Sequence, residues 1–398
     1  MNNILKNTLI LTLLFLSIEQ HAQNLTSNTF GKGIGIMAKD SSYSMKISTR
    51  FQTLYVGTTE TGSNNWESQM LIRRARLKFD GYAFSPKLIY KIELGLSNRD
   101  HGNGIPETRN TAGLILDAVL KYEFAKGWEL WAGQTKLPGN RERVISSQKL
   151  QFVDRSLVNS RFTLDRDIGV QLHNSTNIGP AVLKFIGSIS MGEGRNITDP
   201  NKGGYDYTIR TEILPFGEFK SNGDYFGSDL KREETPKLSM AVTYDFNDGA
   251  SRQRGQLGSF MKDQNNVLVM ADLSTIFADM MFKYKGFSMM SEYANRVNKT
   301  GVLAITGPAS TRKFYSGQGL VAQAGYLIPS NYEFALRYTT IMPDDTALSG
   351  LPRADEYTVG FSKYFSEHNF KIQSDVSLIQ VPGANDEYRV RLQCELSF

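Results

Sequence analysis

The sequence has a single cysteine, Cys394, and only four histidines among its 398 residues. One cysteine excludes both a disulfide framework and a cysteine-based zinc site, and four histidines leave little material for histidine-rich metal chemistry. Beyond the first twenty residues there is no run of 18 or more apolar residues, so no membrane-spanning helix is predicted. We therefore expect neither a metal nor any other cofactor, and the helical class of membrane protein is excluded.

A strong excess of one charge is also missing. The chain carries 45 lysines and arginines against 40 acidic residues, a formal net charge of +5. This balance does not indicate a nucleic-acid-binding protein. Aromatic residues make up 11% of the chain and there are only 12 prolines, which argues against extensive disorder. The composition is that of a folded protein without nucleic acid as a partner.

The N-terminus has the pattern of a secretory signal peptide over residues 1–22. Lys6 supplies the positive charge, residues 9–18 form the apolar run, and Ala22 offers a small residue for cleavage. The apolar run is too short to cross about 30 Å of hydrocarbon as a helix. We therefore expect the chain to be exported. Residues 23–45 are predicted either to remain periplasmic or to help plug the fold that follows.

The rest of the chain alternates apolar and polar residues in stretches of about ten. The clearest case is 388–398, YRVRLQCELSF, in which every second residue is apolar and Cys394 lies on the apolar face. A period of two indicates β-strands and not helices. Similar alternation recurs at 88–97, 116–124, 332–338 and 370–378. We count roughly sixteen such strands, more than the seven to nine of a soluble β-sandwich.

An outer-membrane β-barrel explains this pattern best, with a soluble sandwich or propeller as the alternative. Such a barrel turns apolar side chains to lipid and polar ones to its lumen, with short turns at one end and long loops at the other. YAFSP and EFAKG are tight connections, whereas 98–112, 137–164 and 217–235 are long. The prediction is an all-β, antiparallel transmembrane barrel of about 16 strands over residues 46–398.

The C-terminal residue, Phe398, also supports an outer-membrane location. Phe398 ends an alternating strand, and this arrangement resembles the C-terminal signal that the barrel-assembly machinery reads in outer-membrane proteins. We therefore expect a protein of the cell outer membrane, with outer-membrane lipid and lipopolysaccharide among its partners.

Several stretches resemble the phosphate-selective porin O/P family. They are the segments 30–55, 72–100, 131–147 and 282–296 together with the closing strand, and the most specific pieces read RRARLKFDG and GQTKLPGNRER. The resemblance implies a 16-stranded barrel, usually a homotrimer, that passes anions through a constriction lined by arginines and lysines. The dense lysine cluster that accompanies the family's strongest phosphate selectivity has no counterpart that we can place here.

The segment 137–166 is the most informative connection. It holds six basic against three acidic residues, and its candidate anion-binding side chains are Arg141, Arg143, Lys149 and Arg155. The resemblance implies that this segment folds inward and narrows the pore. The alternative is a solvated basic loop outside the barrel that binds lipopolysaccharide. Inside a pore, guanidinium groups would bind phosphate or carboxylate oxygens, often through two hydrogen bonds.

The alternation assigns a second basic set to the lumen. These side chains are Arg50, Arg74, Arg76, Lys78, Arg389 and Arg391. Because a barrel closes, the first and last strands are neighbours, and these arginines are predicted to form a cationic stripe on three adjacent strands. Arg73 falls in the lipid-facing register, so it is expected to extend toward the membrane rim.

The sequence thus predicts a porin for passive diffusion of small anions, with phosphate or similar oxyanions as the leading solutes. The alternatives are a general, weakly selective porin and a closed structural or adhesion barrel. An enzyme is not expected, because none of His101, His173 and His368 stands in a recognisable nucleophile motif.

Overall fold

The computed structural model describes residues 24–26, 29–101, 108, 113–263, 265–301, 313–344 and 351–398. The predicted signal peptide, residues 1–22, lies outside these described residues. Among the described residues, every helix is too short or too polar to span a bilayer.

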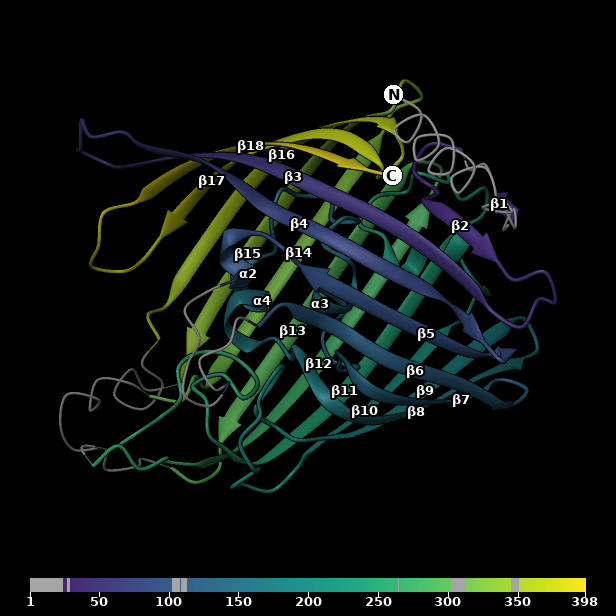
Figure 1. Ribbon diagram of the computed structural model, residues 1–398. Helices are drawn as coiled ribbons and strands as arrows, with labels where there is room; N and C mark the ends of the chain where they lie inside the picture. The colour runs from purple at the N-terminus through teal and green to yellow at the C-terminus, as the bar shows by residue number, and fades with distance from the viewer. Residues whose placement is uncertain are drawn as a thin grey trace, which may run out of the picture.

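The described residues form 18 strands in one sheet. Their bounds are β1 (Asn24–Thr26), β2 (Ile34–Met37), β3 (Ser44–Glu60), β4 (Glu67–Ala83), β5 (Ser85–Gly95), β6 (Ile115–Ala125), β7 (Trp128–Lys136), β8 (Arg166–Ile178), β9 (Ala181–Ser190), β10 (Asp206–Leu214), β11 (Lys237–Ala250), β12 (Ala271–Tyr284), β13 (Phe287–Asn298), β14 (Gly317–Leu327), β15 (Tyr332–Pro343), β16 (Ala354–Ser366), β17 (Phe370–Gln380) and β18 (Glu387–Ser397). Each strand from β3 onward pairs antiparallel with the next, and β18 pairs with β3. The predicted closed barrel is confirmed, with 16 strands in the barrel wall (Figure 1).

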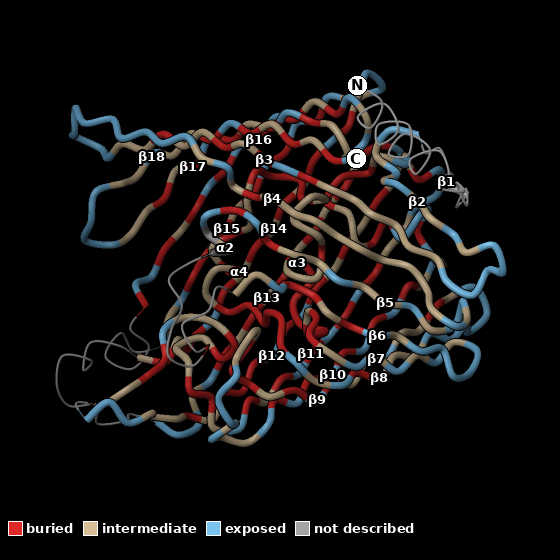
Figure 2. Tube along the Cα trace, viewed as in Figure 1, coloured by how far each residue is buried: buried red, intermediate tan, exposed pale blue. Residues whose placement is uncertain are grey.

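The period of two in the sequence becomes an outer apolar and an inner polar face. In β10, Tyr207 and Ile209 are 41% and 51% exposed, whereas Thr208 and Arg210 between them are 0% and 2% exposed. Figure 2 shows this alternation as changes of burial along the strands. Polar side chains are buried inside and apolar ones exposed outside, the reverse of a soluble sandwich, so that alternative is wrong. A surface of this kind matches a hydrocarbon environment.

The closing strand β18 has the predicted register. Gln393 faces the lumen and donates from Nε2 to Oε1 of Gln373 on β17, at 2.6 Å. Leu392 on the opposite face is 49% exposed. Because side chains alternate along a strand, Cys394 lies on the outer face with Leu392.

A β-bulge in β4 redirects one arginine. The register between β3 and β4 passes from Gln52–Arg74 to Thr53–Ile72, so Arg73 is an extra residue in β4. A bulge breaks the strict alternation of sides. Arg73 therefore turns inward, and its Nη2 lies 2.6 Å from Oδ2 of Asp154. The prediction that Arg73 faces lipid at the rim was wrong for this reason.

The N-terminal strands extend the barrel wall at its seam. Phe398 forms backbone hydrogen bonds with Thr49 on β3, and β2 pairs with Ser44–Ile47 of β3 beyond that point. Strand β1 pairs with β2. The two short strands thus cover the edge of β3 that β18 leaves free, and an uncovered edge would offer unpaired backbone groups.

The connections fall into two sets. At one end of the barrel, which also holds the chain's C-terminus, six turns span at most four residues; at the other end lie the long connections. The exception is 215–236, which joins β10 to β11 at the short-turn end. We predicted 217–235 to be one of the long loops that alternate with tight turns, and its place among the short turns contradicts that alternation. Its buried Phe219 explains the departure, because it ties the connection to the barrel's interior.

In the part of the chain that the structure describes, the long connections hold three short α-helices: α2 (Asn98–His101), α3 (Arg141–Val144) and α4 (Leu157–Phe162). The connection 137–165 carries α3 and α4 and lies inside the ring of strands (Figure 1). Val158 and Phe162 of α4 pack against Phe277 and Val321 on the inner wall. Glycine makes room for this contact, because a Cβ at Gly319 of β14 would lie 3.0 Å from Val158 Cγ2.

The register of β18 is testable with the single cysteine. In folded protein in lipid, Cys394 should react slowly with a membrane-impermeant maleimide, because its thiol faces hydrocarbon, and fast after unfolding in urea. As a control, Arg389→Cys in a Cys394→Ser background should react quickly from the lumen. Fast labelling of Cys394 in folded protein would mean that the register is shifted by one residue.

Candidate pore

A buried ion-pair network anchors the inward connection. Arg141 of α3 is fully buried, and its Nε lies 2.6 Å from Oδ1 of Asp279 on β12. Arg210 of β10 binds the other oxygen of Asp279, also at 2.6 Å. Arg141 Nη1 also donates to the backbone oxygen of Asp224. Removing one partner of such a network leaves a buried charge without compensation, so these contacts hold α3 against the wall formed by β10 to β12.

The tip of the same connection spans the barrel seam from the inside. Ser147 accepts a hydrogen bond of 2.7 Å from Nη2 of Arg50 on β3. Gln148 donates from Nε2 to Oγ of Ser397 on β18, also at 2.7 Å. Arg50 pairs in turn with Glu395 of β18 at 3.1 Å. The connection therefore crosses the lumen and contacts both strands that close the barrel.

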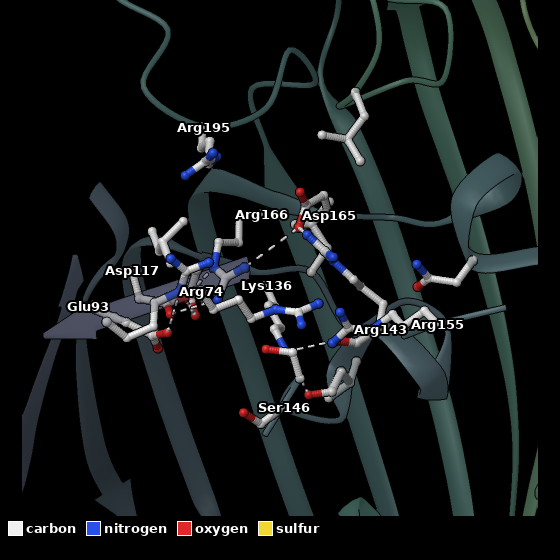
Figure 3. A pocket seen from close by; sticks show the side chains of 18 of the residues that line it. Arg74, Glu93, Asp117, Lys136, Arg143, Ser146, Arg155, Asp165, Arg166 and Arg195 are labelled. Carbon is white, nitrogen blue, oxygen red and sulfur yellow. Dashed lines mark hydrogen bonds and ion pairs between the residues drawn. The ribbon is translucent and has the colours of Figure 1, made fainter. Parts of the chain in front are cut away.

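Between the connection and the wall from β4 to β8 lies a cavity of about 640 Å³, which we call the large cavity (Figure 3). Ten basic and five acidic side chains line it. Its acidic members are all paired with bases; Asp117, for example, binds Arg166 at 3.1 Å and Lys91 at 2.8 Å. The large cavity therefore has an excess of positive charge.

A second cavity, of about 270 Å³, lies nearer the short-turn end, and we call it the small cavity. Six basic side chains line it: Lys46, Arg50, Arg76, Lys78, Lys91 and Lys149. Among the residues that the structure describes, Glu93 is the one acidic side chain in this lining. Arg76, Lys91, Glu93 and Ser146 line both cavities. The two cavities therefore adjoin, with a neck between the β4–β5 wall and the tip of the connection.

Several bases around the large cavity are held by groups that do not cancel their charge. Lys136 Nζ donates to the backbone oxygens of Arg143, Val144 and Ile145. Arg155 donates to the backbone oxygens of Glu142 and Ile145. Lys121 Nζ lies 3.4 Å from the ring centroid of Trp131. Carbonyls and rings orient a cation but leave its positive field in place.

The structure brings most of the predicted basic residues to the two cavities. Arg74, Arg76, Arg143 and Arg155 line the large cavity, and Arg50, Arg76, Lys78 and Lys149 line the small one. Their predicted role in anion binding remains a prediction.

Three predicted residues lie elsewhere. Arg141 is buried in the anchoring network, Arg391 pairs with Asp375 at 2.6 Å, and Arg389 pairs with Glu387 at 2.7 Å. Arg391 is opposite Val56 on β3, six residues from Arg50, or about 20 Å at 3.3 Å per residue. The predicted arginines do lie on three adjacent strands, β18, β3 and β4, but only Arg50, Arg74 and Arg76 of them line the cavities, so the role of the stripe stays a prediction.

The sequence reading missed other basic lining residues. Lys91 and Lys121 share the lumen-facing parity of β5 and β6, so the alternation could have found them. Arg195 also lines the large cavity, but it belongs to the connection 191–205, where no periodicity assigns a direction.

Charged neighbours shift the pKa values of two side chains in the connection 137–165. Burial raises the pKa of Asp154, but Arg74 and Arg73 outweigh burial and hold that pKa well below its usual range. Burial and the nearby ammonium of Lys78 lower the pKa of Lys149 to about 8, and Asp224 opposes the shift. Asp154 thus stays an anion that holds two arginines, whereas Lys149 can lose its charge in mildly alkaline solution.

Nothing in the described residues resembles a metal site, because they contain no group of three or more His, Cys, Asp or Glu side chains suited to hold an ion. Most of the charged side chains that line the two cavities are basic. The sequence model of the phosphate-selective porin O and P family matches residues 45–386, most of the chain. The chain belongs to this family.

Solved structures agree with the porin fold. A loop-deletion mutant of OmpT from Vibrio cholerae has a TM-score of 0.57 at 8% identity, covering 90% of this porin and 100% of that chain. The outer membrane channel DcaP of Acinetobacter baumannii has a TM-score of 0.56 at 13% identity, covering 92% and 99%. A comparison with curated proteins gave no significant match. Family and fold together identify an outer-membrane channel protein, and they point away from an enzyme.

The anchoring network makes a stability prediction. Arg141→Met should destabilise the folded porin in detergent by about 3–5 kcal/mol, because it leaves buried carboxylates short of a cation, and it should make single-channel conductance larger and noisier. Urea unfolding followed by tryptophan fluorescence and bilayer recordings measure these effects. Lys220→Gln, which removes the exposed pair with Glu234, should change neither property. Wild-type unfolding and conductance in Arg141→Met would contradict the anchoring role.

Proposed function

We propose that this porin passes small anions by diffusion through the large and small cavities, with phosphate or similar oxyanions as its preferred solutes. The observation that carries the proposal is the lining of the small cavity, with six basic side chains against one acidic. A passage lined by one sign of charge concentrates ions of the opposite sign.

The route of the anions follows from the part of the inner barrel wall that the connection 137–165 leaves uncovered. The connection 137–165 covers the inner face of β12 to β15 through α4, and the passage is left along β3 to β8. At the neck, Arg76, Lys91 and Arg50 approach Ser146 and Ser147. Guanidinium and ammonium donors beside hydroxyl groups suit an oxyanion, because each oxygen can accept charge-assisted hydrogen bonds. We therefore assign the constriction to this neck.

A weakly selective general porin is the second candidate, and one observation favours it. The five acidic side chains of the large cavity neutralise part of its basic lining; Arg76, for example, is paired with Asp100. If this compensation dominated, the porin would pass solutes of either charge. Three partner predictions remain proposals. Assembly as a homotrimer rests on family membership, and contact with lipopolysaccharide rests on the outer-membrane location. Recognition of Phe398 by the barrel-assembly machinery rests on the alternating pattern of the closing strand.

Bilayer recording distinguishes these candidates. Under a KCl gradient, the wild-type porin should show an anion-selective reversal potential, and added phosphate should block the chloride current, because the multiply charged oxyanion binds the basic neck more tightly than chloride. Conductance without anion preference would favour the general porin. Folded porin that does not conduct would favour a closed structural barrel.

The neck can be tested by substitution. Arg76→Gln should lower the chloride-to-potassium permeability ratio roughly two- to fivefold, because one unit charge about 4–8 Å from the ion contributes on the order of 1 kcal/mol. Arg389→Gln is the matched control, since Arg389 pairs with Glu387 away from both cavities. Equal effects of the two substitutions would show that the selectivity does not arise at the neck.

Anion preference should also depend on pH through Lys149. Its pKa of about 8 means that the ammonium is charged at pH 7 and neutral at pH 9.5, so the permeability ratio should fall as pH rises through 8. The facing charged groups are Lys78 and Asp224; burial, Lys371 and Lys149 keep the pKa of nearby His368 well below its usual range, so it stays neutral throughout. Lys149→Arg should abolish the fall, because guanidinium stays charged. A fall that persists in this variant would assign the titration to another group.

A further inference from the structure

The connection 215–236 is long although it lies at the short-turn end, and it folds into the barrel. It includes the turn η2 (Lys220–Tyr225). Phe219 is buried with Leu150 of the connection 137–165 and with Met281 and Met290 of the inner wall. The connection 215–236 therefore lies beneath the tip of the pore-forming connection.

Buried hydrogen bonds fix this segment in place. Lys283 Nζ of β12 donates to the backbone oxygen of Ser228 at 2.7 Å, and Ser228 Oγ donates to Glu333 of β15 at 2.6 Å. The carboxylate of Asp229 accepts a hydrogen bond from the backbone N–H of Gly286 at 2.8 Å. Contacts with β12, the β12–β13 turn and β15 make the segment a rigid support.

The support touches the basic residue at the edge of the small cavity. Gly227 N donates to the backbone oxygen of Lys149 at 2.7 Å. Lys149 Nζ lies 3.7 Å from the ring centroid of Phe226. The approach at Gly227 leaves no room for a side chain, because a Cβ there would lie 2.5 Å from the backbone nitrogen of Gln151. Lys149 is thus held at both its backbone and its ammonium group.

We propose that Phe226 is a positioning residue that holds the Lys149 ammonium at the small cavity, and that this placement sets part of the porin's preference for anions. The inference rests on the proposed function, since it concerns the same passage. It adds a determinant from outside the cavity, because Phe226 does not line the small cavity.

Electrostatics gives the direction of the effect. Lys149 shares the small cavity with Lys78, whose ammonium repels that of Lys149, and Asp224 attracts it without lining that cavity. A flexible lysine side chain would move away from Lys78. Attraction to the face of the aromatic ring opposes this movement and keeps the charge in the passage.

A space-filling role for Phe226 would behave differently. Its ring centroid is 5.6 Å from that of His368, so it also packs against the β16–β17 turn. If packing were its only role, Phe226→Leu would lower stability and leave ion selectivity unchanged.

The test is a double-mutant cycle in planar bilayers with the full-length porin under a KCl gradient. Phe226→Leu and Lys149→Gln should each lower the chloride-to-potassium permeability ratio about twofold. The double variant should be no lower than Lys149→Gln alone, because both substitutions remove the same placed charge. Phe226→Tyr, which keeps an aromatic ring beside the ammonium, should have the wild-type permeability ratio. Phe216→Leu, at an exposed position of the same segment, is the matched control and should have no effect.

Each other outcome overturns the proposal. Wild-type selectivity in Phe226→Leu, while Lys149→Gln lowers it, would leave the anion porin standing and reduce Phe226 to packing. Additive effects in the double variant would mean that Phe226 acts independently of Lys149. Absence of anion preference in the wild-type porin would remove both this inference and the proposed function.

Discussion

The architecture of the lumen depends on one buried contact, the pairing of Arg141 with Asp279. It joins the inward connection to the wall between β10 and β12, and Arg210 completes it from the neighbouring strand. A buried charge pair adds little net stability compared with apolar packing, but separating its partners leaves a buried charge without compensation. The contact therefore holds α3 against one side of the barrel, and the two cavities lie on the other side.

The inward connection separates the charged side chains of the lumen into those that line the cavities and those that it covers. Charged side chains such as Asp279, Glu292 and Arg296 lie buried on the wall from β11 to β13. The inward connection and the segment 215–236 cover much of this half of the barrel, and the open half runs along β3 to β8, where the basic residues gather. The net charge of +5 for the whole chain gives no sign of this separation. A nearly balanced sequence can therefore line a cavity with a local excess of basic side chains, because folding decides which charged side chains are covered.

Local periodicity predicted the barrel, and it did so because backbone alternation is a local property. The same rule placed Arg50, Arg74, Arg76 and Lys78 in the lumen. It failed at Arg73, where a bulge adds one residue and no sequence pattern marks it. It also could not assign Arg141, since the partner that removes it from the passage is 138 residues away. The side of the sheet that a strand residue faces was thus predictable from the sequence. The direction in which a side chain of a connection points was not.

The inward connection also meets the two strands that close the barrel, through Ser147 with Arg50 and through Gln148 with Ser397. These strands lie at opposite ends of the sequence, so their pairing has the longest loop to close and is the slowest kind of contact to form. Residues at the neck of the passage bridge this same pairing. A barrel that has not yet closed therefore lacks the contacts of Ser147 and Gln148 with both strands, so the neck between the two cavities is complete only when the wall is closed.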